Sequence, residues 1–107
     1  MFARFLELKA KKGQGRALLS LLEEKLPVVK KAPGFLDEAH LVPEESPDSV
    51  LIVSFWDSRE SAENFRKEHY RALADAYKAL LESEIRVHLC DVPIGMTSLA
   101  KAKAARP

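Results

Sequence analysis

Alternating apolar and polar side chains predict four β-strands in this chain. The strands are expected over residues 2–9, 35–42, 49–56 and 84–92. In the first strand one face carries Phe2, Arg4, Leu6 and Leu8, and the other carries Ala3, Phe5, Glu7 and Lys9. The third strand is apolar at nearly every position, so we expect both of its faces to be covered and the strand to lie near the middle of a sheet.

Apolar residues spaced three and four apart predict a helix that begins at Arg16. Its apolar face is formed by Leu18, Leu19, Leu22, Leu26 and Val29. Pro27 lacks a backbone donor and its ring crowds the preceding turn, so we expect it to kink or end the helix. Pro33 and Gly34 then stop the helix firmly.

A second, longer helix is predicted after the third strand. Asp57 and Glu60 have the spacing of a capping box, and no Gly or Pro interrupts the chain until about Glu82. The apolar face of this helix carries Ala62, Phe65, His69, Leu73, Tyr77 and Leu80. A straight helix of this length would span roughly 37 Å, whereas a strand such as the third spans only roughly 26 Å. We therefore expect a bend or break near residues 67–70.

The order strand, helix, strand, strand, helix, strand is that of the ferredoxin-like βαββαβ fold. The expected fold class is α+β, with a four-stranded antiparallel sheet that carries both helices on one face. Because the first and third strands are apolar on both faces, the open face of the sheet needs a cover. We expect a second copy of the chain to provide it, which gives a homodimer joined through the open sheet face.

Composition excludes several classes of protein. The 107 residues include 17 Lys and Arg against 16 Asp and Glu, so the chain lacks the basic excess that nucleic-acid binding by charge requires. No apolar run approaches the ~18 residues of a membrane span. Residues 1–12 lack the apolar core of a signal peptide, and we expect a cytoplasmic protein. Cys90 is the single cysteine, which excludes an internal disulfide.

Charge is distributed unevenly along the chain. Residues 1–33 hold eight basic and three acidic side chains, whereas residues 34–64 hold one and eight. This separation either favours contact between copies or is a chance arrangement of solvated faces. We divide the chain into one domain, residues 1–92, and an Ala/Lys-rich tail, residues 93–107.

Two short segments and the order of the elements carry a family resemblance. The segments are the entry to the second strand, Pro33-Gly34-Phe35, and the end of the third strand, Phe55-Trp56-Asp57-Ser58, which Glu60 and Phe65 follow. Over about residues 1–92 the chain resembles the antibiotic biosynthesis monooxygenase domain. The resemblance implies a dimeric α/β barrel. It also leaves the activity open, because the family includes cofactor-free oxygenases of aromatic polyketides, quinol oxidases and haem-degrading enzymes.

The residues that define the haem-degrading branch are missing. That branch has an Asn on the first strand, a Trp on the second helix and a His ten residues later. This chain has no Asn within residues 2–9, Phe65 at the helix position and Asp75 ten residues further on. Gly13 and Gly15 lack the third glycine of a dinucleotide site. We therefore expect no cofactor.

The resemblance implies a cofactor-independent monooxygenase that acts on a small aromatic or quinol substrate. Such chemistry needs an apolar pocket for an electron-rich phenol, and a polar group that removes or stabilises the phenolic proton. The family's pocket lies between helices and sheet, where this sequence supplies candidate substrate-binding residues: Trp56, Phe65, Tyr70 and Tyr77. His69 is the candidate catalytic base, because histidine is the side chain that exchanges a proton near physiological pH.

Each candidate also has an alternative interpretation. Aromatic residues such as Trp56 often only fill a core, and the protein is then a non-catalytic ligand-binding or structural homodimer. His40 and His88 are expected on strand faces toward the partner, without a three-ligand metal site. Cys90 is expected to be an inert buried thiol. An open cavity of about 300 Å³ that His69 faces favours the enzyme, whereas a cleft filled by its own side chains favours the alternative.

Overall fold

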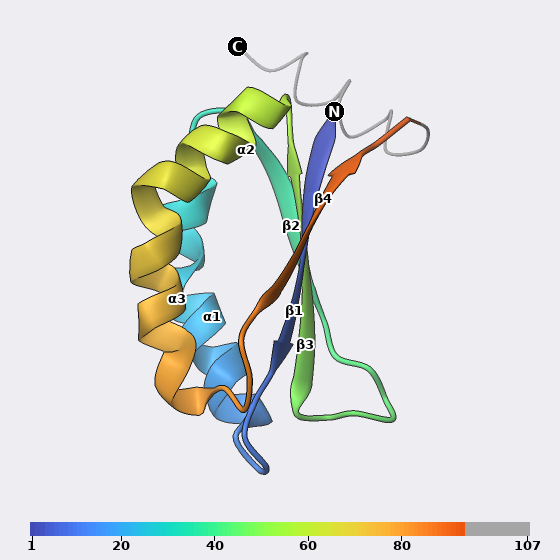
Figure 1. The fold of residues 1–107 in the computed structure, drawn as a ribbon, viewed down its shortest axis with the longest axis vertical. Coiled ribbons are helices and arrows are strands. Elements are labelled where there is room, and N and C mark those ends of the chain that lie inside the picture. The colour runs from blue at the N-terminus through green and yellow to red at the C-terminus, as the bar shows by residue number, and fades with distance from the viewer. Residues whose placement is uncertain (94–107) are drawn as a thin grey trace.

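The computed structural model describes residues 1–93 and confirms a ferredoxin-like α+β fold. The first helix is α1 (Gly15–Lys30). The four strands are β1 (Phe2–Lys9), β2 (Phe35–Leu41), β3 (Ser49–Trp56) and β4 (Arg86–Asp91). The second helical region consists of α2 (Arg59–Phe65), a π-helix (Arg66–Tyr70), α3 (Arg71–Tyr77) and a 3₁₀ turn (Lys78–Leu80). Figure 1 shows α1, α2 and α3 together on one face of the sheet.

The sheet is antiparallel, with the strand order β2-β3-β1-β4. Strands β1 and β3 pair along their whole length, from Phe2 opposite Trp56 to Lys9 opposite Ser49. Strand β4 pairs with β1, and β2 pairs with β3. The prediction that the third strand lies near the middle of the sheet is confirmed, and β1 shares that position.

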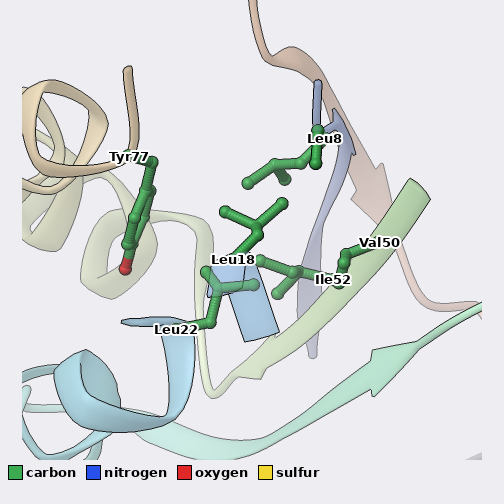
Figure 2. Close-up of a cluster of buried hydrophobic side chains, with 7 residues drawn as sticks. Leu8, Leu18, Leu22, Val50, Ile52 and Tyr77 are labelled. Carbon is green, nitrogen blue, oxygen red and sulfur yellow. The ribbon is translucent and has the colours of Figure 1, made fainter. Parts of the chain in front are cut away.

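The inward side chains of β1 and β3 form two apolar clusters beneath the helices. The first cluster consists of Leu8, Ala10, Leu18, Leu22, Val50, Ile52 and Tyr77. Figure 2 shows members of this cluster converging from β1, β3, α1 and α3. The second cluster consists of Phe2, Val29, Trp56, Ala62 and Phe65. Full burial of one such Leu or Val contributes roughly 1.5–3 kcal/mol, so these clusters fix the helices on the sheet.

The other face of the sheet has an apolar centre and a polar edge. The pairing register puts these apolar side chains on it: Ala3, Phe5, Ala39, Leu41, Leu51, Val53 and Phe55. On the β4 side, His88 Nε2 lies 2.7 Å from Glu7 Oε2, and this hydrogen bond lowers the pKa of Glu7. No helix within residues 1–93 covers this face (Figure 1).

Two details of the helix ends differ from the prediction. Helix α1 continues past Pro27 to Lys30, so Pro27 does not end it. Pro27 lacks the N–H that would bond to the carbonyl of Glu23, so the helix loses one hydrogen bond, and only three helical residues follow this position. The cap of α2 is Ser58 instead of Asp57, since Ser58 Oγ accepts the backbone N–H of Ser61 at 3.1 Å.

The predicted bend near residues 67–70 coincides with the π-helix Arg66–Tyr70. The helical region ends at Leu80, before Glu82, and β4 begins two residues later than predicted, at Arg86. Apart from Pro93, the predicted tail lies outside the described residues. Within residues 1–93, no helix is long and apolar enough to cross a membrane.

Substitution of Gly34, at the turn into β2, tests how closely this turn packs against α2. Its φ is +84°, and a Cβ atom there would overlap the side chains of Ser61 and Asp57. Gly13 has a similar φ of +80°, but a Cβ atom there would meet open space. Both substitutions by Ala incur backbone strain of about 1 kcal/mol. We predict that Gly34→Ala lowers the free energy of unfolding by at least about 2 kcal/mol more than Gly13→Ala does, because it adds a steric overlap. Urea denaturation checks this, and equal losses would contradict it.

Candidate functional site

A row of polar side chains crosses the inner face of the sheet. The register places Glu38 of β2 beside Ser54 of β3, and Ser54 beside Arg4 of β1. Leu89 of β4 lies on the other side of Arg4. Trp56 and Ile52 flank Ser54 on the same face of β3, and each belongs to one of the two apolar clusters. The row therefore separates the clusters and places charge at the centre of an otherwise apolar surface.

Arg4 is the buried charge in this row. The residue is only 4% exposed, and its Nε and Nη2 atoms have no hydrogen-bond partner within residues 1–93. The guanidinium carbon lies 5.1 Å from the centre of the Tyr70 ring, a cation–π contact. Burial lowers the pKa of Arg4. An unsatisfied buried donor costs roughly 1–3 kcal/mol, so the burial of Arg4 lowers the free energy of unfolding.

The other polar side chains of the row have partners. Trp56 Nε1 donates to Ser54 Oγ at 3.0 Å. Glu38 Oε2 lies 2.7 Å from His40 Nε2, and both side chains are largely buried, at 9% and 18% exposure. His40 pairs with Ile52 of the inner face, so the prediction that His40 faces a partner copy is wrong. With Glu38 and His40 hydrogen-bonded to each other, Arg4 is the only member of the row with unsatisfied buried donors, within the described part of the chain.

Two adjoining spaces lie between the helices and the sheet. The inner one measures about 50 Å³, and its lining includes Arg4, Glu38, Ser54, Trp56, Phe65, Tyr70 and Tyr77. The outer one measures about 450 Å³ and lies between α3 and the chain that leads into β4. Tyr70, Ala74 and Ile85 line both spaces. We call the two spaces together the cleft.

The outer space is open because the helices do not reach over β4. Val87 and Leu89 are on the inner face by register, yet they are 38% and 46% exposed. The walls of the outer space combine apolar groups such as Leu81 and Ile85 with polar groups such as Lys78 and Glu82. The inner space is too small for an aromatic ring, since an engineered cavity of roughly 150 Å³ is what binds benzene. The outer space is large enough for one.

The structure brings together four of the five residues predicted for the site. Trp56, Phe65, Tyr70 and Tyr77 all line the inner space. His69 is not among the residues that line the cleft. It lies against Phe65, with ring centres 5.2 Å apart, and borders a separate surface hollow of about 400 Å³.

The π-helix explains the placement of His69. In an α-helix, His69 would lie on the same face as Phe65, because the two residues are four positions apart. For this reason the sequence predicted that His69 faces the cleft. A π-helix bonds residues five apart, which brings the fifth residue, Tyr70, round to the face of Phe65. Tyr70 thereby reaches Arg4, and the α-helical spacing resumes with Ala74 and Tyr77, which also line the inner space.

Sequence reasoning missed Arg4 and Glu38 as members of the site. The signal for Arg4 was present: it is a charged residue at an inward position between Phe2 and Leu6. Such positions are almost never occupied by a charge unless it is paired. Within residues 1–93, no three His, Cys, Asp or Glu side chains come together in a way that would hold a metal ion.

The fold and the cleft define a small α+β protein with a ligand-sized space between helices and sheet. The model of the family described as antibiotic biosynthesis monooxygenase matches residues 1–84. The chain belongs to this family, which confirms the resemblance seen in the sequence. No match was found among proteins of curated function.

Solved structures share the same fold. Rv0793 from Mycobacterium tuberculosis aligns with a TM-score of 0.75 and 15% identity, covering 90% of this chain and 97% of that chain. NE2512 from Nitrosomonas europaea, a protein of unknown function, gives 0.77 and 22%, covering 88% and 90%. A Deinococcus radiodurans structure that bears the family's name gives 0.78 and 18%, covering 89% and 95%. At these identities the likeness establishes the fold alone.

The burial of Tyr77 at the inner end of the cleft predicts how the stability of the protein changes with pH. Burial raises the pKa of Tyr77 to about 12, and the negative charge of Glu38 adds to this effect. An unfolded tyrosine has a pKa of about 10. The folded state therefore prefers the neutral phenol, and its stability is intact below pH 10 and declines between pH 10 and 12. We predict a loss of about 2 kcal/mol by pH 12 from this group.

Tyr77→Phe is the variant that tests this. Denaturant unfolding at increasing pH should show less loss of stability for Tyr77→Phe than for the wild type between pH 10 and 12. The absorbance of tyrosinate in the native protein should also lose its highest-pH step. A Tyr77 that ionises near pH 10 in the native protein would contradict the closed inner space.

Proposed function

We propose that the protein is a cofactor-independent monooxygenase that oxidises a small aromatic or quinol substrate in the cleft. Family membership supports a monooxygenase at the level of the family name. The observation that carries the proposal is an outer space of about 450 Å³ that adjoins a buried inner end with polar side chains. This arrangement suits a flat apolar ring that carries a hydroxyl group.

The chemistry requires an electron-rich phenolate next to dioxygen. The phenolate transfers an electron to dioxygen, and recombination of the two radicals forms a carbon–oxygen bond. With an anthrone, the ring CH₂ becomes a carbonyl: one oxygen atom enters the product, and the other leaves as water with the two hydrogens. The substrate supplies all the electrons, so no further reductant is needed. The apolar side chains Leu81 and Ile85 of the outer space offer contact surface for the substrate ring.

We assign Tyr70 as the side chain that contacts the substrate hydroxyl. Tyr70 lines both spaces, and its ring lies over the Arg4 guanidinium. Its phenol group both donates and accepts hydrogen bonds, so it orients the substrate hydroxyl at the junction of the two spaces. His69 borders the other side of Phe65 and serves as a matched control.

Oxygen consumption with a panel of hydroquinones and anthrones tests the activity. The wild type should consume oxygen with at least one member, Tyr70→Phe should reduce the rate about tenfold or more, and His69→Ala should stay within about threefold of the wild type. Added catalase returns half of the oxygen if the product is hydrogen peroxide, which separates a quinol oxidase from a monooxygenase.

The outcomes distinguish the enzyme from its alternative. No oxygen uptake by the wild type with any substrate would contradict the proposal and favour a non-catalytic ligand-binding or structural homodimer. A rate that falls in His69→Ala and persists in Tyr70→Phe would reverse the assignment of the two residues.

We also propose that the open sheet face joins two copies of the chain. Phe5, Leu51, Val53 and Phe55 of the central strands are only half-buried on this face, although the strands around them are paired. Charged groups such as Asp37 and Arg86 lie on the edge strands β2 and β4, as expected for the rim of an interface. A second copy presents the same apolar centre and the same rim, which suits a symmetric contact.

Val53→Glu tests this interface, because it places a charge at the centre of the apolar face. We predict that the wild type is a dimer in light scattering after size exclusion and that Val53→Glu is a monomer. The matched control is Val28→Glu, since Val28 is 37% exposed on α1, away from the sheet. A monomeric wild type, or a dimer that survives Val53→Glu and is lost in Val28→Glu, would contradict the proposed interface.

A further inference from the structure

Arg4 is a buried charged residue in the lining of the inner space of the cleft. Arg4 lines this space, and its Nε and Nη2 atoms find no acceptor within residues 1–93. No carboxylate of the described residues lies within ion-pair distance of it, since Glu38 is held by His40. Buried polar groups in folded proteins are nearly always hydrogen-bonded. An exception that lines a cavity indicates an acceptor that comes from outside the chain.

The size of the inner space limits what this acceptor is. About 50 Å³ is more than the roughly 30 Å³ that a water molecule occupies in the liquid, and much less than a ring needs. The space therefore suits one or two oxygen atoms. The rest of the ligand would extend past Tyr70, Ala74 and Ile85 into the outer space, because these residues line both.

We infer that Arg4 binds the oxyanion of an aromatic ligand, a phenolate or an aromatic carboxylate, whose ring lies in the outer space. This inference rests on the proposed function only for the aromatic character of the ligand. The oxyanion supplies the acceptors that the guanidinium lacks, and charge-assisted hydrogen bonds of this kind are about twice as strong as neutral ones. Under the proposed function, Arg4 would hold the substrate as the phenolate, the form that transfers an electron to dioxygen.

The charges around Arg4 are the basic Arg66 and the acidic Glu38 and Glu63, and the acidic side chains Asp75, Glu82 and Glu84 line the outer space. The backbones of Glu38 on β2 and Arg4 on β1 are two strand spacings apart, about 10 Å, and both side chains line the inner space. Glu38 also has a hydrogen-bond partner of its own, because its Oε2 lies 2.7 Å from His40 Nε2. In a space closed to solvent, the interaction of a phenolate with Arg4 is screened less than it would be in water. The bound phenol should therefore ionise at a lower pH than the free phenol does.

Binding of para-nitrophenol measures this directly, since its phenolate absorbs visible light and its neutral form does not. We expect the wild type to lower the apparent pKa of the bound phenol by about one unit, which is a tenfold preference for the phenolate. Benzoate should compete for the same site, and benzyl alcohol should not. This pair of competitors shows whether a carboxylate serves as well as a phenolate.

The variants are Arg4→Met and Arg4→Gln, with Arg71→Met as an exposed control on α3. Both Arg4 variants should lose the pKa shift, and Arg71→Met should keep it. Without ligand, Arg4→Met should raise Tm by about 4 °C, because an apolar side chain replaces an unsatisfied charge. A purely structural Arg4 would instead lower Tm on substitution. Arg4→Gln provides the binding result if Arg4→Met does not fold.

The result that would overturn the inference is a wild type that does not bind para-nitrophenol, or that binds it without a preference for the phenolate. Retention of the pKa shift in the Arg4 variants would overturn it as well. This outcome is separate from the test of the enzyme. Phenolate binding without oxygen consumption would support the role of Arg4 and contradict the proposed function. Oxygen consumption without a preference for the phenolate would support the proposed function and contradict the role of Arg4.

Discussion

The structure depends on a charge that is buried at the middle of its central strand pair. Strands β1 and β3 provide the inner face on which the helices pack, and Arg4 interrupts that face with a guanidinium that lacks acceptors within residues 1–93. A core that only had to be stable would place an apolar residue there, since desolvation of an unpaired charge is costly. Strained or costly positions of this kind cluster at functional sites. The burial of the two apolar clusters on either side of Arg4 offsets the cost of this buried charge.

The candidate site around Arg4 depends on the π-helix and on the position of α3, which does not cover β4. The π-helix brings Tyr70 over Arg4, and the helices leave the inner face of β4 uncovered, so that a space of about 450 Å³ adjoins the buried end. Two faces of one sheet then have different roles. The inner face holds the cleft, and the apolar centre of the outer face suits a second copy of the chain.

Periodicity predicted the fold almost completely, because it depends on alternation and helical spacing, which single residues rarely change. The order of elements and the central position of β3 follow from it, whereas the irregularity near residues 67–70 was predicted from the length of the second helix compared with a strand. The site was harder to predict. The inner space is lined by Trp56, Phe65, Tyr70 and Tyr77. His69 was assigned to the cleft as well, because an unbroken α-helix was assumed and the π-helix could not be recognised from the sequence. Arg4 was visible as a charge on an apolar face, yet its lack of a partner appears only in three dimensions.

Nitrogen NMR of the arginine side chains is the measurement that tests the central claim most directly. The Nε–H signal of Arg4, assigned by its loss in Arg4→Gln, reports on a proton that has no acceptor among residues 1–93. The account predicts that saturating benzoate or para-nitrophenolate shifts this signal and slows its exchange with solvent, while the signal of exposed Arg71 stays unchanged. An Arg4 signal that does not respond to any aromatic oxyanion would contradict the account.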